Sequence, residues 1–318
     1  MAFFEPHPLP VSLANLRLAA ARVRAQGLPL AVVELAFDAA PFRVADEDAD
    51  LVIRKRSSTR LWHKERLLNL AIAALPASCR YVAWLDADVV FERDAWVEEA
   101  RRVLEDEIVV QPFATAYWLG DGEHQVTGPR PQGLGEGLEM AGFAATMAGA
   151  EDRRGTLSDF TRHGHCGFAW AARRDFLARH GLYDRAIIGA GDAVAAHAFA
   201  ADADYLRGRN FMLRNFTPAE RHAIGAWGTP VAAETGGRMG WVAGRVLHLY
   251  HGPFRARQYQ ARHDILREGH FDPAADIALD ESGCWRWATY KPALHASVAA
   301  YFAARAGAAP AAPAGATA

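Results

Sequence analysis

The sequence has few cysteines, no long hydrophobic run and almost no net charge, and each shortage limits what the protein can be. Its three cysteines, Cys79, Cys166 and Cys284, are far apart and odd in number, which argues against a disulfide framework and against a cysteine metal site. We therefore expect a reducing, cytoplasmic location. No apolar run approaches the length that crosses a membrane, and the start lacks the basic and apolar segments of a signal peptide.

The charge balance argues against nucleic acid as a partner. The formal net charge of the 318 residues is −2, so the chain has no overall basic field to attract a polyanion. Hydrophobic residues make up 51% of the chain, which indicates a globular fold with a large core. We expect one large domain over residues 1–306. Residues 307–318 are mainly Ala, Pro and Gly and predict a disordered tail, because they have little to bury.

The most informative segment is residues 81–91, which read YVAWLDADVVF. Five apolar residues lead directly into two carboxylates, Asp86 and Asp88. Such a run suits a strand buried on both faces of a parallel sheet, and ligands collect at the carboxyl ends of such strands. Two carboxylates there would repel a phosphate-bearing ligand unless a divalent cation lay between them. The segment therefore predicts a metal-dependent site for a phosphorylated or nucleotide substrate.

The same Asp-Ala-Asp string occurs at two other places, and these show that its context matters. Residues 48–50 lie in an acidic, loop-like stretch, and residues 202–204 end an alanine-rich helical stretch. Carboxylate pairs are common on protein surfaces. We therefore assign function only to the pair that follows an apolar strand.

Elsewhere the pattern alternates between strands and helices, which predicts a mostly parallel α/β sheet flanked by helices. The expected strands include residues 30–37, a short edge strand at 52–54, and residues 108–111, 167–172 and 245–250. The expected helices are one capped by Ser12 and ended by Gly27, residues 64–75, one capped by Asp94, residues 174–180 and 192–201, and a basic helix over about 257–268.

A glycine-rich stretch over residues 119–165 interrupts this rhythm. Long loops inside a compact domain are usually functional lids or disordered, and the α/β pattern resumes afterwards. We expect a lid or acceptor loop here. It separates a nucleotide-binding half, about 1–115, from an acceptor half, about 116–306.

Residues 62–71, which read WHKERLLNLA, carry the first of three resemblances to a known family. They are similar to the Arg-x-Lys-Leu-Leu-Asn-Val-Gly segment of the β-1,4-galactosyltransferases, which also precedes a strand and an Asp-x-Asp pair. More broadly, the layout resembles nucleotide-sugar glycosyltransferases of the GT-A type, including glycosyltransferase family 2. On this resemblance, Arg66 and Asn69 would support the site of the nucleotide-sugar donor. Glu34, in the second strand, lies where such enzymes often contact the nucleobase or the ribose.

The second resemblance runs from Cys166 to Asp192. Its parts match, in order and spacing, a Gly-Gly-Val-Ser-Ala segment, a helix with Phe-Leu, an Asn-Gly-Phe turn and a Trp-Gly-Trp-Gly-Gly-Glu-Asp run of the galactosyltransferases. The last run here has fewer acids and no tryptophan, and Asp192 is its remaining carboxylate. The resemblance implies that Asp192 is the general base that takes a proton from the acceptor hydroxyl. The same residue also suits a helix N-cap.

The third resemblance completes the metal site. Residues 246–252 read VLHLYHG, and the galactosyltransferases have Met-x-x-His in the corresponding place, where both residues bind manganese. His248 and His251 would be the ligands here, together with Asp88. Residues three apart on a strand point to opposite faces, so both histidines reach one ion only if the chain bends near Tyr250. Imidazoles, carboxylates and diphosphate oxygens suit Mn²⁺, with Mg²⁺ as the alternative.

The basic residues after this block are candidates for neutralising the departing nucleoside diphosphate. They are Arg255, Arg257 and Arg262, with Tyr259 among them. A solvated basic helix is the simpler interpretation of each arginine alone.

Taken together, the three blocks predict a metal-dependent GT-A-type glycosyltransferase. The donor is expected to be a nucleotide sugar, most simply a UDP-sugar, and Asp86 would contact its ribose or a metal-bound water. By analogy with the galactosyltransferases the reaction inverts the anomeric centre. The acceptor is a glycan, a lipid-linked molecule or a small molecule.

Two alternatives remain open at this point. Phosphohydrolases of the haloacid-dehalogenase type also place Asp-x-Asp after an apolar strand, although usually near the start of the domain. A catalytically inactive protein that binds a nucleotide sugar would explain why Asp192 has few acidic neighbours.

Overall fold

Helices and short strands alternate along the whole chain in the computed structural model, which describes residues 1–6, 11–126, 137–252 and 261–305. Its strands are β1 (Ala2–Phe4), β2 (Ala31–Phe37), β3 (Leu51–Ser57), β4 (Tyr81–Leu85), β5 (Val89–Phe91), β6 (Val109–Gln111), β7 (Thr115–Trp118), β8 (Glu139–Ala141), β9 (Ala169–Arg173), β10 (Gly240–Trp241), β11 (Arg245–His248), β12 (Ile277–Leu279) and β13 (Trp285–Trp287). Its helices are α1 (Ser12–Arg24), α2 (Lys64–Ala74), α3 (Trp96–Asp106), α4 (Phe143–Gly149), α5 (Arg153–Leu157), α6 (Arg174–His180), α7 (Gly191–Phe199), α8 (Ala203–Leu206), α9 (Pro218–Thr235), α10 (Arg262–Glu268) and α11 (Pro292–Arg305), with 3₁₀ turns η1 (Asp46–Asp48) and η2 (Phe211–Leu213). The described residues thus form one mixed α/β domain.

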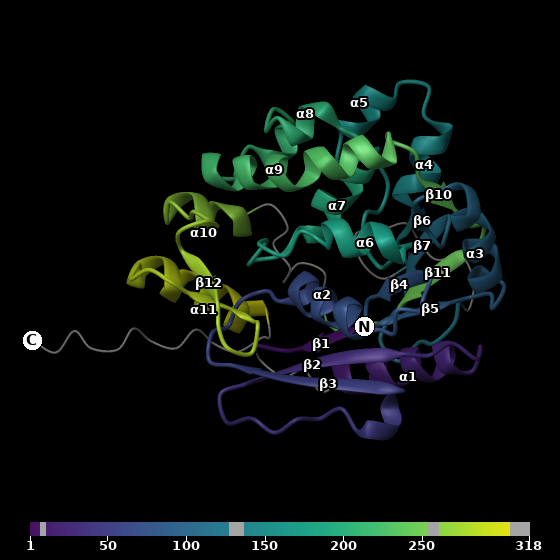
Figure 1. The fold of residues 1–318 in the computed structure, drawn as a ribbon, viewed down its shortest axis with the longest axis horizontal. Helices are drawn as coiled ribbons and strands as arrows, with labels where there is room; N and C mark the ends of the chain where they lie inside the picture. Colours follow the sequence, from purple (N-terminus) through teal and green to yellow (C-terminus); the bar gives the residue numbers. More distant parts are fainter. Residues whose placement is uncertain (7–10, 127–136, 253–260, 306–318) are drawn as a thin grey trace, which may run out of the picture.

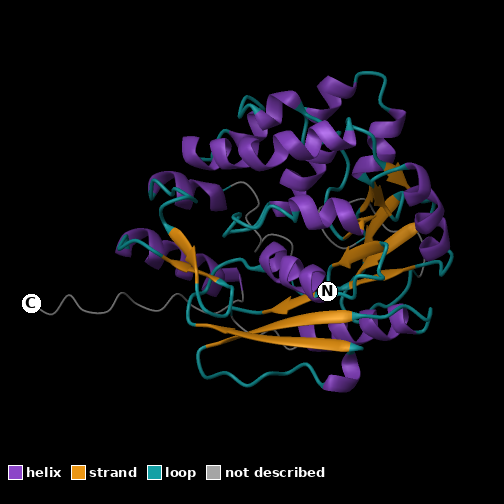
Figure 2. Cartoon of the chain, in the orientation of Figure 1, coloured by secondary structure: helices purple, strands orange, loops and turns teal. Residues whose placement is uncertain are grey.

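The first three strands form the parallel sheet that the sequence predicts, in the order β1-β2-β3. The central strand β2 is buried along almost its whole length, as a parallel strand covered on both faces should be. Strand β3 is an edge strand, as expected, but it runs from Leu51 to Ser57 and is longer than the predicted 52–54. Figure 2 shows these strands side by side at one end of the molecule.

The two four-stranded sheets are mixed and the β12-β13 pair is antiparallel, so the prediction of a mostly parallel sheet is wrong beyond β3. One sheet has the order β10-β6-β9-β4, and β9 is antiparallel to both of its neighbours. Another has the order β5-β11-β7-β8, in which only β11 and β7 are parallel. Strand β4 is an edge strand that pairs only with β9, and Ala83 on it is exposed. The apolar run at 81–85 reflects packing on both faces, with Val82 and Trp84 in one core cluster and Leu85 in another, so in sequence this edge strand resembles an interior parallel one.

The helices cover the sheets in two groups. Figure 1 shows α1 and α2 against the parallel sheet at one end, while α5, α7, α8 and α9 gather at the opposite end. Two predicted helix caps are absent, because Ser12 is already the first residue of α1 and the residue before α3 is Ala95. The carboxylate of Asp94 instead accepts a hydrogen bond from the side chain of Gln26 at 3.1 Å.

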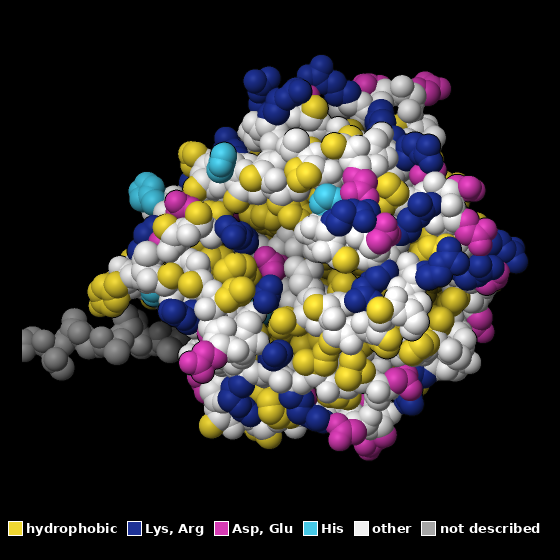
Figure 3. Space-filling model, viewed as in Figure 1, with side chains coloured by type: hydrophobic (Ala, Val, Ile, Leu, Met, Phe, Trp, Pro, Cys, Tyr) yellow, Lys and Arg dark blue, Asp and Glu magenta, His cyan; other side chains and the backbone are white. Residues whose placement is uncertain are grey.

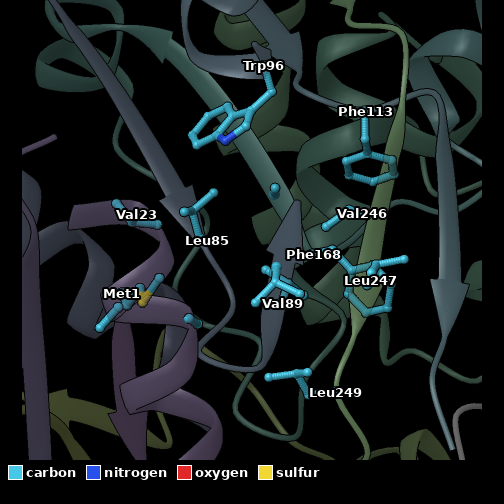
Figure 4. Packing of buried hydrophobic residues seen from close by; sticks show 14 of the residues in the cluster. Met1, Val23, Leu85, Val89, Trp96, Phe113, Phe168, Val246, Leu247 and Leu249 are labelled. Atoms are coloured by element: carbon cyan, nitrogen blue, oxygen red, sulfur yellow. The ribbon is translucent and has the colours of Figure 1, made fainter. Parts of the chain in front are cut away.

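The main hydrophobic core lies where helix α1 meets the strands that carry the site. Figure 4 shows Val23 of α1, Leu85 at the end of β4 and Val89 of β5 in one cluster with Val246 and Leu247 of β11. All five side chains are buried. Burying aliphatic side chains of this size stabilises a fold by about 1.5–3 kcal/mol each. This packing fixes the ends of β4, β5 and β11, which is where the predicted acids and histidines stand.

The glycine-rich stretch is more ordered than a simple lid. Strand β8 pairs with β7, and α4 and α5 follow it. Phe143, Met147 and Leu157 from these helices are buried. They belong to a core cluster with Trp170 of β9. Most of the described part of the stretch is therefore built into the domain, because its apolar residues find a core to pack against.

Some predictions concern segments outside the described residues. These are the roles of Arg255, Arg257 and Tyr259, and the tail from residue 307 onward. On the face shown in Figure 3, basic and acidic side chains are interspersed. Among the described helices, none has both the length and the apolar character that a membrane crossing requires.

Candidate active site

Asp86 and Asp88 stand in the short link that joins two different sheets. Strand β4 ends at Leu85 and β5 begins at Val89. The backbone N–H of Asp86 donates to the carbonyl of Phe168 at 2.8 Å, and the carbonyl of Asp88 accepts from the N–H of Leu249 at 2.8 Å. The link is therefore held between the segment before β9 and the segment after β11, so that distant parts of the chain converge on the two carboxylates.

The structure brings the three predicted metal ligands together. The Nε2 atom of His251 lies 3.0 Å from Oδ2 of Asp88, and Nε2 of His248 lies 3.7 Å from the same oxygen. One ligand atom from each residue lies within 4.8 Å of the others. Strand β11 ends at His248, so residues 249–251 lie outside the strand and its alternation of faces no longer applies to His251. Both histidines can therefore face Asp88 despite their spacing.

Aromatic side chains hold His248 in place. Its imidazole stacks on the ring of Phe168 with centroids 4.8 Å apart, and the ring of Trp118 lies 6.2 Å away. Phe168 has a φ of 76°, a left-handed conformation that is uncommon for a bulky residue. This backbone conformation directs the ring of Phe168 against His248, so His248 is buried and has little freedom to turn.

The donor atoms of these three residues fit a first-row divalent cation. Two imidazole nitrogens and one carboxylate suit ions such as Mn²⁺, whereas Mg²⁺ prefers oxygen ligands alone. A second carboxylate, that of Asp86, lies in the same short link but outside the triad. The donor set therefore favours manganese over magnesium among the two ions that the sequence predicts.

Lys64 is the site residue that the sequence interpretation missed. Its Nζ lies 2.5 Å from Oδ1 of Asp86 and donates to both oxygens of Asp192 at 2.9 and 2.8 Å. Burial lowers the pKa of Lys64, but the charges of Asp192, Asp86 and Glu65 outweigh it and hold the pKa well above its usual value. The signal was present in the sequence, because Lys64 occupies the position of the first arginine in the galactosyltransferase segment.

Asp192 faces the site rather than capping its helix. It lies in the first turn of α7, whose N-cap residue is Ala190. A Cβ atom at Gly167 would lie 3.2 Å from the carboxylate of Asp192, so the glycine of the second matched block lets the two segments approach. The carboxylate is held by Lys64 and is about one-third exposed, which leaves it accessible to a ligand.

Burial and like charge disfavour ionisation of Asp86. Its pKa is raised to about 7, chiefly by burial; the charges of Asp192 and Asp88 add to this effect and Lys64 opposes it. The cationic Lys64 therefore links two carboxylates that would otherwise repel each other. It connects Asp86, in the link that also holds Asp88, to Asp192 on α7.

All of these side chains line one cavity of about 1040 Å³. Its walls also include Arg262 of α10, which is 6% exposed and lies against Gly189, three residues before Asp192. A volume of this size is large enough for a nucleotide sugar. Carboxylate, imidazole and basic side chains therefore line one cavity that has room for a charged ligand as large as a nucleotide sugar.

Two predicted donor-binding residues serve the fold instead. Arg66 donates from Nε to the carbonyl of Gly283 at 2.5 Å. Asn69 donates to the carbonyl of Leu182 at 2.9 Å and accepts from its N–H at 2.8 Å, and both side chains contact Asp184. Neither lines the described cavity. They attach α2 to neighbouring loops on the side away from Lys64.

Glu34 is also placed away from the cavity. It is 2% exposed, and its two carboxylate oxygens accept the backbone N–H groups of Arg43 and Val44 at 2.6 and 3.1 Å. These bonds satisfy a buried charge. The structure therefore gives Glu34 a role in fixing the loop at residues 43–44 against the parallel sheet and does not support the predicted contact with the donor.

Comparison of this chain with protein-family models, with curated proteins and with solved structures found no match in any of the three. The resemblance to the galactosyltransferases therefore depends on the three sequence blocks and on how the fold brings them together.

Replacing Lys64 with methionine should destabilise the protein by about 3 kcal/mol, because removing one partner of a buried ion pair leaves charge uncompensated. Here two carboxylates, Asp86 and Asp192, would face each other without the cation. Urea unfolding measures the change. Arg102→Met, at a position 68% exposed on α3, is the control. A loss below about 1 kcal/mol would mean that the Lys64 pairs contribute little.

Replacing Glu65 with glutamine should raise stability at high pH. Burial raises the pKa of Glu65 to about 8, with the charge of Asp192 adding to it and Lys64 opposing. The unfolded chain releases this proton near pH 4.5 and the folded chain only near pH 8, so wild-type stability falls between these values. Relative to wild type, Glu65→Gln should gain up to about 4 kcal/mol from pH 5 to pH 8. Urea unfolding at both pH values tests this, with Glu105→Gln as control, and an equal difference at both would contradict it.

Proposed function

We propose that this protein is a metal-dependent glycosyltransferase that moves a sugar from a nucleotide sugar to a hydroxyl group of an acceptor. The observation that carries the proposal is the meeting of Asp88, His248 and His251 at the wall of a cavity that also contains Asp86, Lys64 and Asp192. Each of these residues comes from one of the three sequence blocks or from the segment at residues 81–91.

The triad would hold Mn²⁺ against the diphosphate of the donor, where the ion offsets the charge that develops on the leaving group. Arg262, a buried cation in the same cavity, adds positive charge for a diphosphate. Lys64 keeps the carboxylate of Asp86 in place, where it can accept hydrogen bonds from a ribose. A UDP-sugar is the donor that the resemblance favours.

Asp192 supplies the base in this proposal. As the acceptor oxygen bonds to the anomeric carbon, its proton passes to the carboxylate of Asp192, and the bond from that carbon to the diphosphate breaks. This single displacement inverts the anomeric centre. The bonds from Lys64 to both oxygens of Asp192 orient the carboxylate for this step.

The geometry gives less support to the two alternatives. In a phosphohydrolase of the haloacid-dehalogenase type, His248 and His251 would have no task, yet here both face Asp88. In an inactive binding protein, Asp192 would not need an oriented and partly exposed carboxylate. The three free thiols agree with the cytoplasmic location that we propose for the protein.

Calorimetry with UDP-, GDP- and dTDP-sugars, each with and without Mn²⁺, tests the proposal. We expect one nucleotide class to bind at least tenfold more tightly with Mn²⁺ and then to release its nucleoside diphosphate slowly. Phosphate monoesters should yield no inorganic phosphate under the same conditions. Metal-independent binding of all three classes, or rapid phosphate release, would overturn the assignment.

A further inference from the structure

Two exposed phenylalanines stand at the wall of the cavity. Phe160 is 53% exposed and Phe211 is 69% exposed, and both line the same cavity as Asp192. The other large hydrophobic side chains that are exposed in the described structure, such as Tyr290 and Trp241, do not line it. Exposed apolar surface that gathers at a cavity marks a ligand or partner site.

These two phenylalanines belong to segments that lie side by side. The side chain of Asn210 donates to the carbonyl of Leu157 at 3.2 Å, which joins the end of α5 to the start of η2. Phe160 follows the first segment and Phe211 begins the second. Met212 and Phe216 continue the apolar wall inward, and the ring of Phe216 stacks on His263 at 4.1 Å.

This apolar wall lies on the acceptor side of the proposed site. The triad comes from the β4–β5 link and from β11, whereas Asp192 begins α7. Helix α7 packs on α8 and α9, the two helices that flank η2 along the chain. Asn210, the residue before Phe211, donates to Asp202, and Asp202 pairs with His197 of α7. The segment of Phe211 is therefore attached to the helix that carries Asp192, whereas the triad lies on other elements.

Basic side chains accompany the aromatic ones. The guanidinium of Arg214 lies 4.3 Å from the ring centroid of Phe211, and that of Arg305 lies 4.7 Å from the ring of Trp62. All four residues line the cavity.

The acids that line this part of the cavity are already engaged. Glu5 pairs with Arg43, and Asp159 accepts from both the N–H and the hydroxyl of Thr161. Arginine held over an aromatic ring offers a positive charge beside an apolar surface. The wall is therefore complementary to a molecule that is both apolar and negatively charged.

We propose that the acceptor is an amphiphile with a hydrocarbon or aryl body and one anionic group, a phosphate or a carboxylate. Its body lies along Phe160, Phe211 and Met212, and its anionic group lies at Arg214. Its hydroxyl group is then directed toward Asp192. This inference rests on the proposed function, because it assigns the second substrate of that same reaction.

Binding of small amphiphiles to the full chain, without metal or nucleotide, tests this directly. The probes are octyl phosphate and nonanoate, with ethyl phosphate lacking the hydrocarbon body and octyl glucoside lacking the charge, all as monomers below their micelle concentrations. We expect octyl phosphate to bind at least tenfold more tightly than ethyl phosphate and at least fivefold more tightly than octyl glucoside by calorimetry. The ratio of octyl phosphate to nonanoate affinity tells which anionic group the site prefers.

Two variants and two controls separate the apolar part from the charged part. Phe211→Ser should weaken octyl phosphate about tenfold and should weaken octyl glucoside equally. Arg214→Gln should remove the preference for octyl phosphate over octyl glucoside while keeping the effect of chain length. Tyr290→Ser, at a position 90% exposed, and Arg102→Gln should change neither affinity, because neither residue lines the cavity.

Several results would overturn the inference. These are equal affinities for octyl phosphate and octyl glucoside, no effect of Phe211→Ser, binding only to sedimented vesicles of anionic lipid, or concentration-dependent dimerisation that Phe211→Ser abolishes. The last two would assign the patch to a membrane surface or to a second copy of the chain.

Failure of the proposed function looks different. In that case no UDP-sugar releases UDP in an Mn²⁺-dependent way, while octyl phosphate still binds. The cavity then binds the amphiphile, but the amphiphile is not an acceptor. Mn²⁺-dependent turnover with no amphiphile binding keeps the function and rejects this acceptor.

Discussion

Asp88→Ala should abolish Mn²⁺-dependent turnover of the nucleotide sugar, with a loss of about a thousandfold or more. The variant removes the only carboxylate of the triad and leaves the imidazoles of His248 and His251 without it. A cation bound by two neutral nitrogens in a partly buried site lacks the charge that balances it. Electron paramagnetic resonance titration with Mn²⁺ measures the metal affinity, and release of nucleoside diphosphate measures turnover.

The matched control for this experiment is Asp204→Ala. Asp204 belongs to the Asp-Ala-Asp string at residues 202–204 and pairs with Arg154 at the surface, so it changes the same residue type in the same local sequence. We expect it to keep metal affinity and turnover within about twofold. If Asp88→Ala also keeps both, the cation site is not at this triad.

Asp192→Asn should reduce sugar transfer by about a hundredfold to ten-thousandfold while leaving donor binding nearly unchanged. An amide keeps the shape of the side chain but cannot take a proton, and general base catalysis contributes a factor of this size. Donor binding should persist because Asp88, His248 and His251 are untouched. Single-turnover transfer assays and donor calorimetry, done on the same preparation, give the two quantities separately.

Asp175→Asn is the control for this second prediction, because Asp175 also lies in the first turn of a helix, α6, but is 67% exposed at the surface. It should leave transfer unaffected. Full transfer activity in Asp192→Asn would show that the carboxylate serves only to pair with Lys64. Loss of donor binding together with transfer would show a structural role for the same pair.

The strands and helices were largely predictable because their patterns are local. The helix starting at Lys64 and the strands at 31–37 and 109–111 lie where apolar periodicity places them. The pairing of the strands could not be predicted from the sequence. Strand β4 reads as an interior parallel strand but is an antiparallel edge strand, because an apolar run records how much of a strand is buried and not the direction of its neighbour.

The candidate site, too, was predictable in part from the sequence. Asp88, His248 and His251 were predicted, and the structure brings them together. On helix α2, however, the prediction chose Arg66 and Asn69, and the structure places Lys64 in the cavity. Helices turn about 100° per residue, so Lys64 and Arg66, two positions apart, lie on nearly opposite faces. The sequence shows that the helix carries basic residues, but not which face it presents.

The sequence by itself determined the chemistry that this protein can offer: an acidic pair after an apolar strand, two late histidines and an acid that opens a helix. Only the tertiary structure decided that both histidines reach the same carboxylate, that of Asp88, and that Lys64 joins Asp86 to Asp192. The reason is physical. Residue type and periodicity are properties of neighbouring positions, whereas a shared site depends on contacts between residues more than a hundred positions apart, such as Lys64 and Asp192, and packing of the whole core sets those contacts.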